Sequence, residues 1–146
     1  MKRILLCIII LVFIGCKSNH EPDNFKLAGT YWAMESDIPD PHAGTMYYYR
    51  VWHFKDDKEA EQTRYATGTT RVDIGHGDDP AKYGYDTNDE KTTIRVNYFE
   101  YPKISITIES YNQFSKSTEK DSWNGEFLTE NLLIMNETRR FLRIVR

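Results

Sequence analysis

Cysteine is the residue this sequence most conspicuously lacks. The chain contains two, Cys7 and Cys16, and both lie within its first sixteen residues. Residues 17–146 therefore have no thiol for a disulfide bond, a cysteine zinc site or a nucleophile. A domain built from them is held together by its hydrophobic core alone.

Long hydrophobic runs are also scarce. The chain has one, Ile4–Ile14, which follows Lys2 and Arg3 and is followed by Gly15 and Cys16. A membrane-spanning helix needs about 20 apolar residues, so this run is too short. A positive start, a short apolar run and a small residue before the cleavage site are typical of a secretory signal. The pattern predicts a signal peptide over residues 1–15 and a polar tether over residues 16–26.

The predicted cut directly before Cys16 resembles that of a bacterial lipoprotein signal, in which the mature cysteine receives lipid. That resemblance implies membrane anchoring through Cys16 and uptake of labelled palmitate, since two or more acyl chains give stable attachment. Lys17, rather than Asp, after the cysteine implies an outer membrane lipoprotein by the proteobacterial rule, on the periplasmic or surface face. A cleaved signal without lipid is the alternative, because Phe13 stands where that pattern more often has Leu.

An excess of positive charge is absent. The chain has 19 basic and 22 acidic residues, which gives a formal net charge of −3. Proteins that grip nucleic acid electrostatically carry basic patches, so nucleic acid is excluded as a partner.

Sustained helical periodicity is absent too, and short alternating runs take its place. Aromatic residues make up 14% of the chain and favour strands. The predicted strands cover residues 27–34, 45–54, 59–67, 69–74, 83–85, 94–98, 104–109, 122–129, 132–135 and 139–145, with a polar loop over 112–121. Short strands with turn signals every 8–12 residues indicate an antiparallel all-β barrel or sandwich, here one domain over residues 27–146.

Two stretches resemble the lipocalin-like lipoproteins of the Bacteroidetes. The run Leu27–Trp32 is similar to the L-x-G-x-W opening of lipocalin-like barrels, and residues 125–144 are similar to the last hairpins of those lipoproteins. The resemblance implies an up-and-down antiparallel barrel of about eight to ten strands. Members of that family bind small apolar ligands or have no known ligand. Tyr31 stands at the expected Trp position and Trp32 follows it, so either ring could plug the barrel. The arginine that packs over this ring in lipocalins would be Arg143 or Arg140.

The candidate ligand site lies on the strand predicted over residues 45–54. Tyr48, Arg50 and Trp52 share one face, and both faces are apolar enough to be inside. With Trp32 and Arg143, these side chains could line a cavity for an amphipathic acid. In the alternative, the aromatic rings fill the core, and Arg50 faces water or pairs with a carboxylate.

Metal and catalytic sites have little support. Asp73, His76, Asp78 and Asp79 form a polar cluster, but no fixed ligand spacing is present, so a solvated loop is expected there rather than a metal site. No G-x-S-x-G motif occurs. The sequence therefore predicts no catalytic residues, no cofactor and no enzymatic activity.

The predicted function is that of a lipid-anchored envelope protein whose barrel binds a small, partly apolar ligand. Two alternatives stay open. One is a surface glycan-binding module that uses exposed Tyr and Trp. The other is a protein-binding accessory subunit or inhibitor with a filled barrel.

Overall fold

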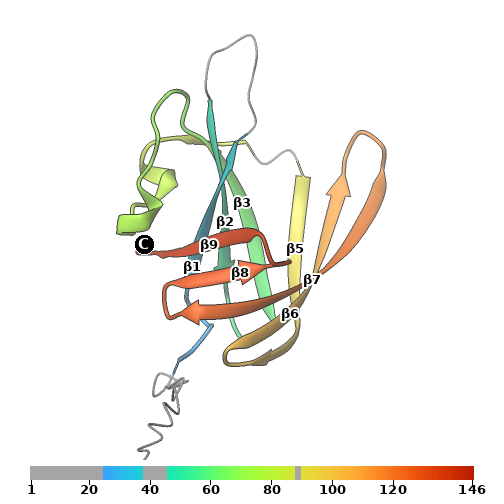
Figure 1. Cartoon of the computed structure of the whole chain (residues 1–146). Helices are drawn as coiled ribbons and strands as arrows, with labels where there is room; N and C mark the ends of the chain where they lie inside the picture. Colours follow the sequence, from blue (N-terminus) through green and yellow to red (C-terminus); the bar gives the residue numbers. More distant parts are fainter. Residues whose placement is uncertain (1–24, 38–45, 88–89) are drawn as a thin grey trace, which may run out of the picture.

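The computed structural model describes residues 25–37, 46–87 and 90–146. Two 3₁₀ helices, η1 (Ile74–His76) and η2 (Pro80–Lys82), lie between the third and fourth strands. The strands are β1 (Tyr31–Asp37), β2 (Tyr47–Phe54), β3 (Glu59–Ala66), β4 (Tyr85–Asp86), β5 (Glu90–Glu100), β6 (Lys103–Asn112), β7 (Ser117–Thr129), β8 (Leu132–Met135) and β9 (Arg139–Ile144) (Figure 1).

Eight of these strands close into an antiparallel barrel. Each pairs with the next along the chain, in the order β1-β2-β3-β5-β6-β7-β8-β9, and β9 pairs with β1. The two-residue β4 adds to β3 outside this ring. The predicted lipocalin-like, up-and-down barrel is therefore confirmed.

The barrel interior is filled by large apolar side chains. Trp32 and Trp52 are fully buried and stand opposite each other on β1 and β2. Trp52 stacks on Phe141 with ring centroids 4.0 Å apart, and Trp32 meets Phe127 edge-on at 5.2 Å. The remaining members of this cluster are mostly isoleucines from β5 and β6 and apolar residues from β8.

Residues 25–30 close one end of the barrel, which we call the plugged end. Leu27 is fully buried, and Phe25 packs against Phe99, Tyr101 and Phe127. Gly29 has a φ of 78°, which allows the tight turn from Leu27 into β1. The first strand therefore begins at Tyr31, not at residue 27, because residues 27–30 form this turn.

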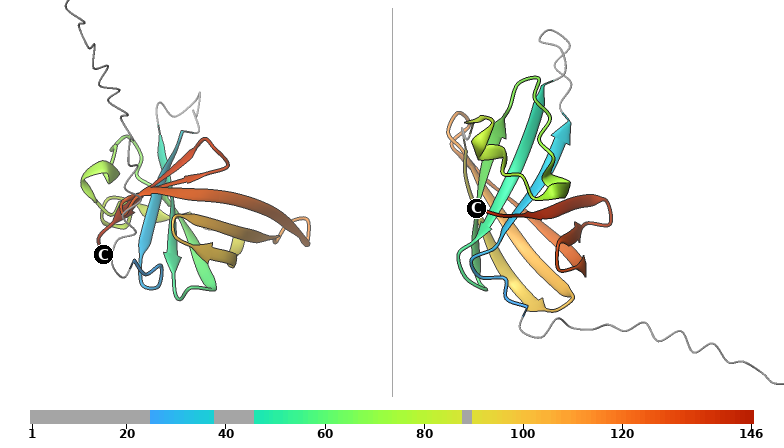
Figure 2. Two further views of the ribbon diagram at one scale, coloured as in Figure 1. Left: turned by 60° about the horizontal axis from the view of Figure 1, so that its bottom comes forward. Right: turned by 90° about the vertical axis from the view of Figure 1, so that its left-hand side faces the viewer.

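A second apolar cluster lies outside the barrel wall. Residues 67–84, which we call the strap, cross the outer faces of β1, β2 and β3 (Figure 2). Val72 and Ile74 of the strap pack with Tyr49 and Val51 of β2. The Tyr49 hydroxyl accepts a hydrogen bond from the Val72 amide at 2.7 Å, and burial raises the pKa of that hydroxyl. Both faces of β2 are thus buried, as its sequence predicts.

Two local predictions are wrong. Residues 69–74 do not form a strand, because the Ile74 amide donates to the Val72 carbonyl in a turn and Val72 donates to the Tyr49 side chain. Residues 117–121 belong to β7 rather than to a loop, because they pair with residues 108–112 of β6. The loop between β6 and β7 is shortened to residues 113–116, where Asn112 Oδ1 accepts from the amides of Phe114 and Ser115.

Candidate functional site

The predicted aromatic site residues lie in the packed interior. Trp52 Nε1 donates to Gln62 Oε1 at 3.1 Å, and Trp32 Nε1 donates to Thr30 Oγ1 at 2.8 Å. Both indoles therefore have a hydrogen-bond partner and no exposed surface. Trp32, not Tyr31, is the ring inside the barrel, since Tyr31 stacks on His53 at 4.1 Å on the outer face.

Tyr48 and Arg50 lie farther along the same face of β2. Tyr48 stands opposite Ser36 and Ala66, and Arg50 stands opposite Met34 and Arg64. Both side chains are half-buried, and Arg50 has an interaction partner within the chain. This end of the barrel is more polar than the plugged end, and a ligand-binding role for these two residues stays a prediction.

Arg143 and Arg140, the two candidates for the arginine beside the barrel tryptophan, occupy different positions in the structure. Arg143 is half-buried and stands directly opposite Trp32 in the β1–β9 ladder. Arg140 pairs with Ile134 of β8 and is exposed. Of the two, Arg143 is the ladder partner of Trp32, and its packing over that ring stays a prediction. Cys16 lies outside the described residues.

A cleft opens where β1 and β9 part. Their ladder has three pairs and ends at Ala33 and Leu142, although β1 continues to Asp37 and β9 begins at Arg139. The β8–β9 hairpin, drawn in red, turns away from β1, drawn in blue (Figure 2, right). The resulting cleft has a volume of about 810 Å³. Its lining comes from β1 (residues 34–36), the strap (71–75), and the start of β9 (138–140 and Leu142).

The cleft has an apolar floor and a charged rim. Met34, Val72, Ile74 and Leu142 supply the apolar side chains. Arg71, Arg139 and Arg140 supply three guanidinium groups, and Glu35 and Asp73 supply two carboxylates. Such a mixture of apolar surface with a few charged groups is typical of sites for amphipathic molecules.

Arg139 connects the cleft to the barrel interior. Its guanidinium carbon lies 4.4 Å from the centroid of the Trp123 ring, which is the distance of a cation–π contact. Trp123 is 4% exposed and packs against Trp52 at 5.8 Å. The Trp123 Nε1 donates to Asp121 Oδ2 at 2.5 Å, which fixes the ring in place. A molecule bound at Arg139 would therefore perturb Trp123.

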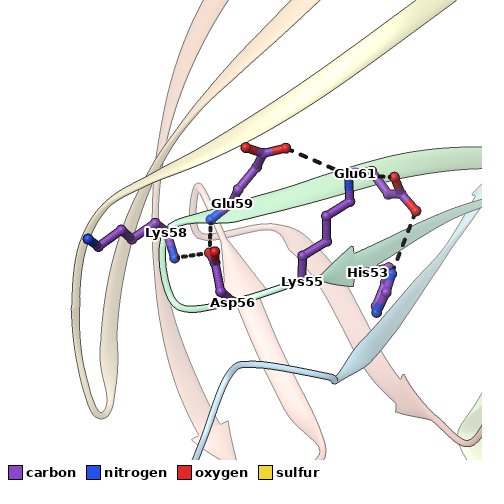
Figure 3. Close-up of polar contacts among 6 residues, drawn as sticks. All are labelled: His53, Lys55, Asp56, Lys58, Glu59 and Glu61. Atoms are coloured by element: carbon purple, nitrogen blue, oxygen red, sulfur yellow. Dashed lines mark hydrogen bonds and ion pairs between the residues drawn. The ribbon is translucent and has the colours of Figure 1, made fainter.

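The charged groups at the turn between β2 and β3 pair with one another. At the turn between β2 and β3, Glu61 lies 2.9 Å from Lys55 and 3.6 Å from His53 (Figure 3). Asp56 accepts hydrogen bonds from the amides of Lys58 and Glu59. The hydrogen bond from Lys55 lowers the pKa of Glu61, and the amide hydrogen bonds lower that of Asp56. These groups stabilise each other and the turn, and leave little charge for a ligand.

The predicted polar cluster around Gly75 is also paired internally. His76 Nδ1 lies 2.6 Å from Asp73 Oδ2, and this hydrogen bond lowers the pKa of Asp73 and raises that of His76. Asp79 is buried and bonds to Arg146 at 2.7 Å. Within the described ranges, no group of three or more His, Cys, Asp or Glu side chains is placed to hold a metal ion.

Sequence reasoning missed the importance of Arg139 and the cleft. The adjacent pair Arg139-Arg140 at the start of the last strand was visible. Whether this pair lines a cleft depends on where the β1–β9 ladder ends, and strand alternation does not reveal that.

No helix in the described part of the chain is long and apolar enough to cross a membrane.

Comparison of the chain with protein families, with curated proteins and with solved structures finds no match.

Proposed function

We propose that the chain is a lipid-anchored lipoprotein of the cell envelope, of the lipocalin-like type, whose non-enzymatic barrel binds a small, partly apolar molecule. The observation that carries this proposal is the cleft between β1 and β9, with its apolar floor and charged rim. Its volume of about 810 Å³ is suited to a ligand of drug-like size, since such pockets measure roughly 300–1,000 Å³.

The packed interior supports the cleft as the binding place. An eight-stranded barrel is only just wide enough for its own side chains or one small ligand. Here Trp32, Trp52, Phe54 and Phe141 occupy that space with no exposed surface. A ligand in the interior would have to displace them, whereas the cleft is open to solvent at its charged rim.

The proposed anchor leaves the cleft accessible. Phe25, the first described residue, lies at the plugged end. The chain from Cys16 to Phe25 spans at most about 30 Å when fully extended. A lipid on Cys16 would hold the plugged end near the outer membrane, while the part of β1 that lines the cleft, residues 34–36, lies farther along the strand from that end.

A second candidate function, glycan binding, rests on a groove in the outer wall. This groove has a volume of about 640 Å³ and crosses β6, β7 and β8. It combines the half-exposed Tyr98 ring with Ser105, Asn124 and Glu126. A ring of this kind has an apolar face and a polar tip, and both suit a sugar. The mixture of apolar and charged groups in the cleft makes the amphipathic ligand the leading proposal.

Replacement of Cys16 by Ser tests the anchoring. A serine hydroxyl cannot form the thioether, so the variant should move from the membrane fraction to the soluble fraction. The wild type should incorporate labelled palmitate and the variant should not. A Cys16→Ser variant that still sediments with membranes, together with an unlabelled wild type, would contradict the proposal.

Titration of tryptophan fluorescence with decanoic acid and methyl decanoate tests the ligand site. Either probe should bind at micromolar concentrations and quench Trp123. Ser36→Phe places a ring in the cleft and should weaken binding by about tenfold or more. Ser122→Phe, which adds the same ring to an exposed position on β7, should not. Because Trp123 contacts Arg139, which lines the cleft, Trp123→Phe should remove the signal.

Two results would contradict this assignment. Quenching that survives both Ser36→Phe and Trp123→Phe would place the ligand away from the cleft. Failure of both probes, with a clear response to oligosaccharides, would favour the groove on β6, β7 and β8 and the glycan-binding function.

A further inference from the structure

The acidic groups of the cleft are already matched. Glu35 lies 3.1 Å from Arg71, which fixes the strap to β1. Asp73 is bonded to His76 at 2.6 Å. Both carboxylates therefore already have a side-chain partner, and both partners come from the strap.

The arginines of β9 are not matched in this way. Among the residues that the structure describes, Arg139 and Arg140 have no carboxylate within ion-pair distance. Other exposed cations of the barrel differ among themselves: Lys55 and Lys120 have acidic partners at 2.9 Å, whereas Lys103 and Lys116, like the two arginines, have no ion pair among the described residues. Arg139 and Arg140 thus add two positive charges to the lining of the cleft, and Arg140 also lines the groove on β6, β7 and β8.

The Trp123 ring also orients the guanidinium of Arg139. The cation–π contact at 4.4 Å holds the guanidinium over the Trp123 ring, and Arg139 also lines the cleft. A guanidinium presents its N–H donors along the edge of its plane, in a fork that matches the two oxygens of a carboxylate or phosphate. A group that is already oriented loses less conformational entropy when it binds an anion.

The unpaired edge of β9 adds backbone donors and acceptors. The β1–β9 ladder ends at Leu142, whereas β9 continues back to Arg139. An edge of this kind presents backbone N–H groups that have no partner strand. A bound anion beside Arg139 and Arg140 would lie within reach of such donors.

We propose that the cleft recognises the anionic head group, a carboxylate or a phosphate, of an amphipathic molecule. Arg139 and Arg140 hold the head group, and the apolar part contacts Met34, Val72, Ile74 and Leu142. This inference rests on the proposed function, because it names the ligand class of the same cleft. It differs from an acid site at Arg50, which lies inside the barrel wall and has a partner within the chain.

Affinities for decanoate, decyl phosphate and methyl decanoate test the inference in the full mature chain. The two anions should bind about ten- to hundredfold more tightly than the ester, because a hydrogen bond to a charged group is worth that much. Arg139→Gln and Arg140→Gln should each remove most of this preference while the ester binds as before. Arg95→Gln, an equal change on an exposed arginine of β5, should leave the preference intact.

Acetate and inorganic phosphate separate a head group from a free anion. Neither should compete with decanoate at concentrations near the affinity of decanoate, since each lacks the apolar part. Competition by either at those concentrations would make the cleft a free-anion site and overturn the inference.

The remaining outcomes separate the inference from the function beneath it. Equal binding of acid and ester in the wild type would reject the anionic class while leaving the cleft as an apolar site. A preference that survives both β9 variants but disappears in Arg50→Gln would move the anion to the barrel interior. Binding of none of the probes would reject the proposed function itself. Circular dichroism of each variant checks that it is folded.

Discussion

The barrel interior and the cleft between β1 and β9 share strands, but their polar groups differ in whether they have partners within the protein. In the interior, each buried indole donates to a neighbour: Trp52 to Gln62, Trp32 to Thr30, and Trp123 to Asp121. In the cleft, Arg139 and Arg140 border open space, and the nearby acids are paired with other partners. The indole N–H groups of the interior are all hydrogen-bonded within the protein, whereas the two arginines of the cleft can bind an anionic ligand.

The difference follows from where the barrel closes. A β-strand ladder satisfies backbone groups and brings side chains into contact, so a ladder that stops early leaves both without a partner strand. Here the closing β1–β9 ladder has three pairs, fewer than the seven between β1 and β2. A register shift in β7 between Phe127 and Thr129 lies opposite Leu132 and Leu133 at the start of β8, and bulges bend a sheet at such points. The closing seam of the barrel is therefore where a ligand site can form.

The largest expected effect is on the interior. Trp52→Ala should lower the free energy of unfolding by about 3–5 kcal/mol, because it removes a fully buried ring that packs on Phe141 and Trp123. Arg139→Ala should cost only about 0.5–1 kcal/mol, since it removes one cation–π contact of an exposed side chain. Urea denaturation followed by circular dichroism measures both. Similar costs for the two variants would mean that Trp52 lines a cavity and that the contrast between the regions fails.

The sequence predicts the fold well because most strands have one clear inner face. Ile104, Ile106 and Ile108 alternate with polar residues, and all three point into the barrel. The strap is harder to predict. Val72 and Ile74 alternate as in a strand, yet they are anchored by packing on β2 and by the Tyr49 hydroxyl. Period-two alternation shows that two residues are buried, but not that a ladder joins them.

The site is less accessible to sequence reasoning than the fold. The ligand prediction for β2 depends on its aromatic residues. Aromatic residues are most often buried in the core, and Trp52 is fully buried. The strand at residues 117–121 was missed because its side chains are all polar and exposed. The cleft combines residues 34–36, 71–75, 138–140 and Leu142, which come from three distant parts of the chain. Only the end of the β1–β9 ladder brings them together.

Arg146 fixes the strap, and thus one wall of the cleft, to the barrel. Its Nε donates to Asp79 Oδ2 and its Nη2 donates to the Tyr65 hydroxyl, both at 2.7 Å. Burial of this guanidinium acts against its charge, but these hydrogen bonds outweigh burial and raise the pKa of Arg146. Asp79 is 3% exposed and also accepts from the Ala81 amide at the start of η2.

A smaller effect is therefore expected when Arg146 is replaced by Met, which keeps the stem and removes the charge. The variant should lose about 1–3 kcal/mol of stability, because Asp79 remains buried without its cation. Proteolysis should then cut first within residues 67–84, and cleft ligands should bind more weakly. Asp79→Asn combined with Arg146→Met should cost less than the two single changes added together. Strict additivity, with an unchanged proteolysis pattern, would show that the strap is held by Val72 and Ile74 alone and that the cleft wall does not depend on Arg146.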